Sequence, residues 1–218
     1  MHNNLVSKEL FMKLSYFTML AISTLVVNAN VVEITEGVPF VEVEANGKTY
    51  KIQRVQEEDK YLTNTYALTS RPSPPFFVQP FEVTDKVETY GELEVLDFIA
   101  KKKGIFIDAR LPNWFYKSAI ATSVNMPFKT FLSDTPEREA LLKELGVLYT
   151  KNGERDFSAA KTILLYCNGA WCGQSPTAIH ALRELGYPEE KMKYYRGGMQ
   201  SWQLLGLSTI VPTKEENK

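Results

Sequence analysis

Two cysteines, Cys167 and Cys172, stand in the stretch LLYCNGAWCGQSP and are the only cysteines of the chain. The stretch follows the apolar run TILLY and precedes the helix-like segment SPTAIHALRELG, which predicts a loop between a strand and a helix N-terminus. Loop N–H groups and the helix dipole stabilise negative charge, so a thiol there is acidified and its thiolate is a nucleophile. Gly169 and Gly173 permit the positive φ angles that such a cradle needs. The pattern indicates a nucleophilic thiol at Cys167, with an inert, buried strand-end cysteine as the alternative.

Cys172 belongs to the segment WCGQS, which resembles the WCGPC motif of thioredoxins with its second cysteine replaced by Ser175. A dithiol oxidoreductase needs C-x-x-C spacing, which is absent here, so this short match carries little weight. A bridge between Cys167 and Cys172 requires Cα atoms no more than about 7 Å apart. A redox role for this pair of cysteines stays open.

The segments around the loop alternate between strands and helices. Apolar runs predict strands, and amphipathic segments predict helices whose starts carry the capping residues Thr89, Thr135 and Ser175. This alternation implies an α/β fold with a mostly parallel sheet and helices on both faces. Ligands bind such sheets beyond the carboxyl ends of the strands, where we expect Cys167. The predicted strands and extended pieces are IFIDA, SVNMPF, TILLYC and KYY, and the predicted helices are ELEVLDFIAKKKG, PEREALLKELG, SPTAIHALRELG and GGMQSWQLLG.

The first 29 residues have the order of a secretory signal peptide. Lys13 precedes the uncharged run Leu14–Val27, and small residues surround a cleavage point near Ala29. The run is shorter than the roughly 18 residues of a membrane span. We therefore predict a signal peptide over residues 1–29, with Met12 as a better start, and an exported, periplasmic protein without a membrane span after cleavage. An uncleaved anchor helix or the first element of the fold is the alternative.

Residues 30–70 are predicted to form a small β-rich extension. FVEVEA and KTYKIQRV alternate in hydrophobicity on either side of Asn46–Gly47, a strong two-residue turn signal, and so predict a hairpin. We interpret the hairpin as a structural cover for the main domain, with a docking surface as the alternative. The proline-rich residues 71–80, RPSPPFFVQP, predict a stiff connector to a domain over residues 81–212, which a polar tail follows at residues 213–218.

The composition allows one domain of ordinary size and argues against several kinds of function. Hydrophobic residues make up 44% of the 218 positions, enough for a substantial core. A formal net charge of −1, from 25 basic and 26 acidic residues, argues against a nucleic-acid surface or a polybasic membrane patch. His180 is the single histidine beyond the signal peptide, and we expect it on the exposed part of a helix. With these few ligands we expect no metal site and no cofactor.

From residue 80 to residue 211 the chain resembles the rhodanese family. GIFIDAR, SVNMPF, ILLYC with its loop, ALRELGY and YYRGGMQSWQLLGL follow one another in the family's order and spacing, and RGGMQSWQLLGL is the most specific piece. The resemblance implies a rhodanese α/β fold in which Cys167 carries sulfur as a persulfide. It also implies that Asp108 and Arg110, the family's D-x-R, support the active-site side of the fold. The positions expected to serve packing are Gly197, Gly198 and Trp202.

The chain also departs from the family's pattern. Ala119 stands where many members have a histidine, and the loop to Ser175 is longer than usual. This loop has no Arg or Lys to hold an anionic donor, which argues against efficient thiosulfate chemistry. Arg110 or Arg196 could reach the pocket, but we favour a structural ion pair as the role of each of these arginines. A phosphatase would need arginine at Gly173, so phosphoryl transfer is disfavoured. The remaining loop residues are Asn168, Gly169, Ala170, Trp171 and Gln174.

Three functions follow from these residues. The favoured one is a sulfurtransferase in which Cys167 takes sulfane sulfur from a small donor and passes it to a thiophilic small molecule or a protein thiol. Cys172 is then a candidate second thiol that resolves the persulfide. The alternatives are a non-catalytic rhodanese-like module, which binds a partner through the hairpin region and Trp171, and a thiol redox protein. Donor, acceptor and oligomeric state stay open at this stage.

Overall fold

The computed structural model describes residues 31–213, so the predicted signal peptide lies outside the described part of the chain. Residues 32–213 belong to one compact unit, in which the hairpin extension and the main domain share a hydrophobic cluster. Within residues 31–213 we find no helix long and apolar enough to cross a membrane.

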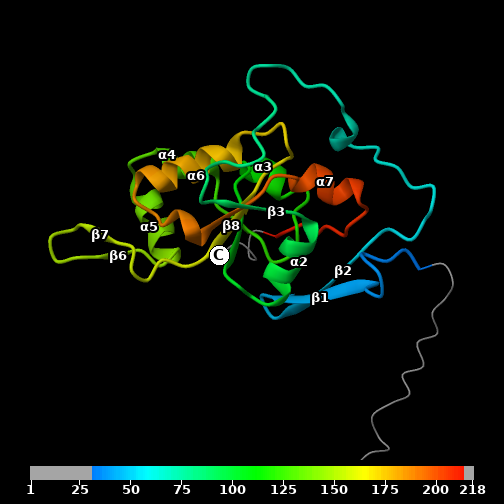
Figure 1. Ribbon diagram of the computed structural model, residues 1–218, viewed down its shortest axis with the longest axis horizontal. Helices are drawn as coiled ribbons and strands as arrows, with labels where there is room; N and C mark the ends of the chain where they lie inside the picture. The colour runs from blue at the N-terminus through cyan, green and yellow to red at the C-terminus, as the bar shows by residue number, and fades with distance from the viewer. Residues whose placement is uncertain (1–30, 214–218) are drawn as a thin grey trace, which may run out of the picture. The chain divides into compact units, whose positions relative to one another are not determined.

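A five-stranded parallel sheet forms the centre of this unit (Figure 1). Asp108 pairs in register with Tyr166, and Tyr166 pairs with Tyr195, so three neighbouring strands end at the same level. Cys167 directly follows the middle one, which confirms the predicted α/β class and places this cysteine at the carboxyl edge. The strand order is β3 (Glu88–Tyr90), β9 (Met192–Tyr195), β8 (Ile163–Tyr166), β4 (Ile105–Asp108) and β5 (Val124–Asn125).

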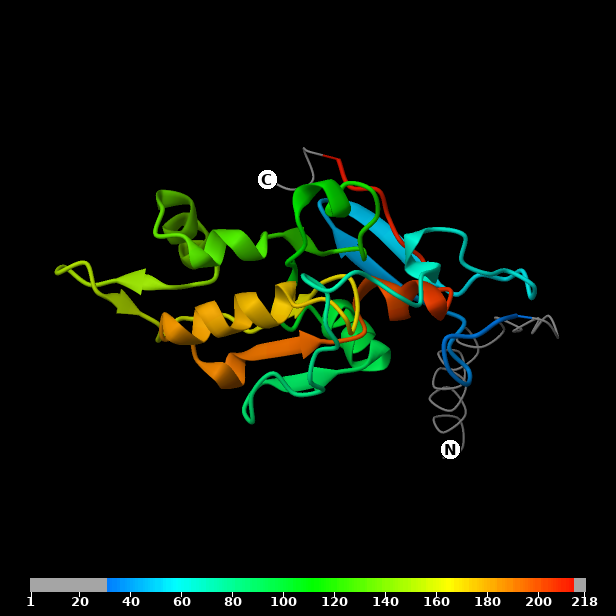
Figure 2. The same ribbon diagram turned by 90° about the horizontal axis from the view of Figure 1, so that it is seen from above.

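Helices cover both faces of the sheet, as predicted (Figure 2). On one face Phe131, Leu142 and Ile179 are buried against Ile107 and Leu165 of the sheet. These three side chains come from α4 (Phe128–Leu132), α5 (Pro136–Glu144) and α6 (Gln174–Glu184). The opposite face is covered by α2 (Glu92–Ala100) and α7 (Gly198–Leu204), and the shorter turns of helix are η1 (Thr65–Ala67), α3 (Pro112–Phe115) and η2 (Glu189–Lys191).

The predicted N-terminal hairpin is present as β1 (Phe40–Ala45) and β2 (Lys48–Gln53), which pair antiparallel. Asn46 and Gly47 form its turn with φ angles of 51° and 71°, the positive values that a two-residue hairpin turn requires. Val43 and Ile52 are buried in the same cluster as residues of α2 and α7. The hairpin therefore extends the core on that face, which supports its interpretation as a structural cover.

Several predicted helix boundaries are wrong, each for a local reason. Thr89 does not cap α2, because it lies in β3 and pairs with Tyr194; Gly91 precedes the helix, and its N–H donates to Glu94 Oε2 at 3.0 Å. The predicted extension of this helix to residue 104 is also wrong, since α2 ends at residue 100.

Ser175 is not the cap of α6, which begins one residue earlier with Gly173 at the N-cap. By contrast Thr135 caps α5, as predicted, by accepting from the Arg138 N–H. A small antiparallel pair, β6 (Leu148–Tyr149) and β7 (Arg155–Asp156), was not predicted, since two-residue strands leave no periodic signal.

Candidate active site

The cysteine loop curls between the end of β8 and the start of α6. The Cys172 N–H donates to the Gly169 carbonyl at 2.9 Å and closes a turn. At the start of α7, the N–H groups of Met199 and Gln200 donate to the Cys167 and Asn168 carbonyls. Gly198 makes this approach feasible: its φ is +54°, and a Cβ there would lie 2.4 Å from the Cys167 carbonyl oxygen. The RGG segment thus holds the loop backbone in place, a packing role.

Both sulfur atoms lie inside this curl. Cys167 and Cys172 are free thiols, and each residue is only 1% exposed. The Cys167 thiol donates to the Cys172 carbonyl oxygen at 3.1 Å, while the Asn168 side-chain amide donates to the Cys172 sulfur at 3.5 Å. The loop therefore brings the two thiols together as the sequence spacing suggested.

The two thiols differ in acidity. The pKa of Cys172 is lowered to about 6. The main cause is hydrogen bonding from the Cys167 thiol, which outweighs the cost of burial, and the N–H groups of Asn168 and Gln174 add to it. Burial, together with the neighbouring Cys172, raises the pKa of Cys167 well above its usual value, although Ser175 partly offsets this. The sequence led us to expect the acidified thiol at Cys167, whereas in this arrangement burial raises the pKa of Cys167 and hydrogen bonding lowers that of Cys172.

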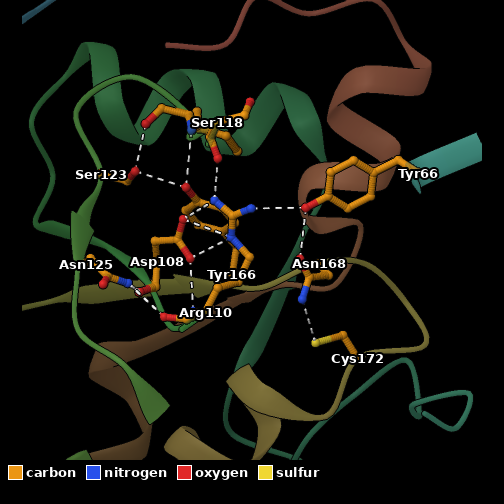
Figure 3. A network of polar contacts seen from close by, with 10 residues as sticks. Tyr66, Asp108, Arg110, Ser118, Ser123, Asn125, Tyr166, Asn168 and Cys172 are labelled. Atoms are coloured by element: carbon orange, nitrogen blue, oxygen red, sulfur yellow. Dashed lines mark hydrogen bonds and ion pairs between the residues drawn. The ribbon is translucent and has the colours of Figure 1, made fainter. Parts of the chain in front are cut away.

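A chain of polar contacts orients the amide that faces Cys172 (Figure 3). Arg110 Nη1 donates to the Tyr66 hydroxyl oxygen at 3.0 Å, and this hydroxyl donates to Asn168 Oδ1 at 2.8 Å. Because the amide oxygen is occupied, the Asn168 NH₂ group turns toward the sulfur. Burial raises the pKa of Tyr66 to about 12, so its hydroxyl remains a donor at neutral pH. Sequence reasoning missed Tyr66, since nothing in TNTYAL marks it as a site residue.

Asp108 and Arg110 form the buried base of this network. Both residues are 0% exposed, and Arg110 Nε donates to Asp108 Oδ1 at 2.9 Å. Burial by itself would lower the pKa of the Arg110 guanidinium group, but the attraction of the Asp108 carboxylate is larger and raises this pKa. Arg110 also donates to the Ser118 carbonyl, so its hydrogen-bonding groups serve the scaffold, as expected of the D-x-R pair.

The other residues singled out from the sequence occupy structural positions. Arg196 donates to the carbonyls of Gln79 and Pro80, which ties the connector to the end of β9. Ala119 is fully buried, and its backbone pairs with Ile210. His180 is exposed on α6, as expected. In the described part of the chain no three His, Cys, Asp or Glu side chains gather in a way that would hold a metal ion.

The connector packs on the cysteine loop through Ala170 and Trp171. The Gln79 N–H donates to the Ala170 carbonyl at 2.8 Å. The ring of Phe76 meets the ring of Trp171 edge-on, with centroids 5.0 Å apart. The Trp171 side chain is also anchored to α7, because its indole N–H donates to Gln200 Oε1 at 2.7 Å. The connector and the cysteine loop are therefore packed against each other.

Comparison with known families identifies the fold. Residues 93–205 match the family described as the rhodanese-like domain. The chain belongs to this family. Cys167 of the rhodanese-like domain lies at the carboxyl end of the central strand β8, and RGGMQSW forms the turn and helix that support it. A comparison with curated proteins finds no match.

Solved structures with a similar fold include several rhodanese-related proteins. A rhodanese-related protein from Thermoplasma volcanium is 20% identical, with a TM-score of 0.41, over 57% of this chain and 99% of that one. The human single-domain sulfurtransferase TSTD1 is 15% identical, with a TM-score of 0.39, over 55% of this chain and 96% of that one. A rhodanese with anions from E. coli is 22% identical, with a TM-score of 0.32, over 50% of this chain and 98% of that one.

Proposed function

We propose that this rhodanese-like domain is a sulfurtransferase that carries sulfane sulfur as a persulfide on Cys167. The observation that carries the proposal is the position of Cys167, which directly follows β8 at the carboxyl edge of the sheet and lies in one curled loop with a second free thiol, Cys172. A second thiol of lowered pKa in the same loop can exchange a proton with Cys167 when Cys167 acts as the nucleophile.

The first half-reaction uses both sulfurs. The Cys167 sulfur attacks the outer sulfur of the donor, and its proton passes to the Cys172 thiolate beside it. A bond forms between Cys167 and the transferred sulfur while the bond from that sulfur to the rest of the donor breaks. The electron pair of the broken bond leaves with the donor remnant, which is sulfite when thiosulfate is the donor. Cys172 ends this step as a thiol, and Cys167 as a persulfide anion.

The second half-reaction returns the site to its starting state. A thiophilic acceptor, either a small molecule or a protein thiolate, attacks the outer sulfur of the persulfide. The bond to Cys167 breaks, its electron pair stays on Cys167, and Cys172 returns the proton. Alternatively the Cys172 sulfur attacks the inner sulfur while its proton passes to the outer sulfur, so that a Cys167–Cys172 disulfide forms and hydrosulfide leaves. On this route an external thiol must reduce the disulfide before the site returns to its starting state.

The second candidate function is that of a non-catalytic rhodanese-like module that binds a partner. The observation that favours it is the burial of both cysteines, together with the absence of a basic residue between Cys167 and Ser175. An inert site predicts slow alkylation of both thiols at pH 7.

Intact-mass analysis separates these functions. The wild type, Cys167→Ser and Cys172→Ser are incubated with thiosulfate, polysulfide and a mercapto-acid donor. We expect the mass of one added sulfur in the wild type and in Cys172→Ser, and none in Cys167→Ser. Added sulfur in Cys167→Ser but not in Cys172→Ser would reverse the roles of the two cysteines. No gain in any protein, together with slow alkylation, supports the non-catalytic module.

We also propose that the protein acts after export to the periplasm, with cleavage near Ala29. The support is the order of residues at the N-terminus. N-terminal sequencing of the protein isolated from its own cells tests this, and a start at residue 1 or 12 would contradict cleavage.

A further inference from the structure

The cysteine loop lacks a cation of its own, and the connector places one on it. No Arg or Lys occurs from Cys167 to Ser175, and Arg110 and Arg196 are both engaged in the scaffold. Arg71, the first residue of the connector, lies with its guanidinium carbon 3.6 Å from the centre of the Trp171 ring. Trp171 immediately precedes Cys172, so this cation is stacked on the loop that holds the acidic thiol.

Arg71 is fixed at this place with unused hydrogen-bonding capacity. Its Nη2 atom donates to the Thr65 carbonyl at 2.6 Å, and its stack on Trp171 orients the plane of the guanidinium group. Its Nε atom is buried and has no hydrogen-bond partner among residues 31–213. A buried donor without a partner is costly, so a group that accepts from it is expected to bind there.

The electrostatics of Arg71 connect it to the thiols. Burial lowers the pKa of Arg71, while a negative charge on Cys172 favours the protonated form of Arg71. The guanidinium group therefore interacts with the Cys172 thiolate across the loop. Its planar fork suits the oxygen atoms of a sulfonate or carboxylate group, which it can bind in bidentate fashion.

We propose that Arg71 is the binding residue for an oxyanion-bearing sulfane donor of the thiosulfate type, and that the connector thereby supplies the cation missing from the loop. The inference rests on the proposed sulfurtransferase function and names the donor class of that site. The oxyanion end accepts from Arg71, and the outer sulfur is directed toward the cysteine pair. The connector then both packs on the cysteine loop and contributes a binding residue to the active site.

The test compares the wild type with Arg71→Gln, Arg71→Lys and the control Arg183→Gln. Arg183 is a surface residue of α6 that pairs with Glu189, so its replacement makes the same change of charge away from the loop. The first readout is the ratio of the alkylation rates with anionic iodoacetate and neutral iodoacetamide. The second is the thiosulfate concentration that gives half-maximal persulfide formation.

We expect Arg71→Gln to lower the alkylation ratio and to raise the half-maximal thiosulfate concentration, each by about tenfold, as for the loss of one charge-assisted hydrogen bond. Arg71→Lys should recover part of both effects, and Arg183→Gln should match the wild type. An unchanged ratio in a folded Arg71→Gln protein overturns the proposal.

Two further outcomes are distinguishable. If no protein forms a persulfide, the proposed function fails, yet the alkylation ratio still decides whether Arg71 binds anions. If Arg71→Gln does not fold, the test instead measures how far sulfate slows the alkylation of the wild-type thiols. Sulfate that slows iodoacetamide alkylation of the wild type and of Arg183→Gln, and protects Arg71→Lys less well, supports the assignment. Sulfate without effect on the wild type contradicts it.

Discussion

The acidity of Cys172 yields the sharpest prediction. With a pKa of about 6, this thiol is roughly 90% ionised at pH 7, whereas a free cysteine with a pKa near 8.5 is only about 3% ionised. Low-pKa thiolates are also weaker nucleophiles, so the alkylation rate at one pH changes much less than this ratio. The midpoint of the rate against pH, and not the absolute rate, therefore carries the prediction.

The perturbation is Cys167→Ala, which removes the thiol donor that contributes most to the acidity of Cys172. A hydrogen bond to a charged group contributes about 1.5–3 kcal/mol, and one pKa unit corresponds to about 1.4 kcal/mol. The midpoint of Cys172 should therefore rise by about one to two units. Cys167→Ser keeps a donor at this position, so its midpoint should remain close to that of the wild type.

The assay measures iodoacetamide alkylation from pH 5 to pH 9 by intact mass, with the ultraviolet absorbance of the thiolate as a second measurement. Fragmentation of the labelled peptide assigns the modified cysteine in the wild type. Two results refute the reasoning: a wild-type midpoint near the free-cysteine value, or the same midpoint in the wild type and in Cys167→Ala.

Three other substitutions test the scaffold of the site. Gly198→Ala places a Cβ against the Cys167 carbonyl, so it should displace the loop and lower both persulfide formation and the melting temperature; normal activity and stability would contradict this close approach. Asp108→Asn leaves the charge of Arg110 buried without its partner and should destabilise the fold by about 3–5 kcal/mol in denaturant titrations, whereas a loss under 1 kcal/mol would count against the buried pair. Hydrogen bonding from Arg155 lowers the pKa of Glu139 to about 2. Glu139 therefore stabilises the fold above its unfolded pKa near 4.5, and this contribution is lost as the pH falls toward 2. Glu139→Gln should therefore lower stability by about 1 kcal/mol at pH 7 and not at pH 2, and an equal loss at both values would exclude the ionic cause.

Local patterns in the sequence were sufficient for the main fold and for the position of Cys167. Alternating strands and helices predicted the parallel sheet, and the Asn46–Gly47 turn predicted the hairpin. These features depend on periodicity and turn chemistry, which neighbouring residues determine among themselves. For the same reason the helix starts at Thr89 and Ser175 were wrong, since strand pairing and the curl of the loop override a capping pattern.

The tertiary structure alone decided which thiol is acidic and what surrounds it. Cys167 and Cys172 share one loop, and their pKa values differ because burial dominates at Cys167 and hydrogen bonding dominates at Cys172. The Tyr66 hydroxyl, which orients the amide of Asn168, comes from a position 102 residues away. Arg71 likewise approaches the loop only because the connector folds back over it. The sequence by itself therefore determined the family and the position of Cys167 at the carboxyl end of a strand. The contact of Tyr66 with Asn168 and the stack of Arg71 on Trp171 arise between distant segments, which no local pattern encodes.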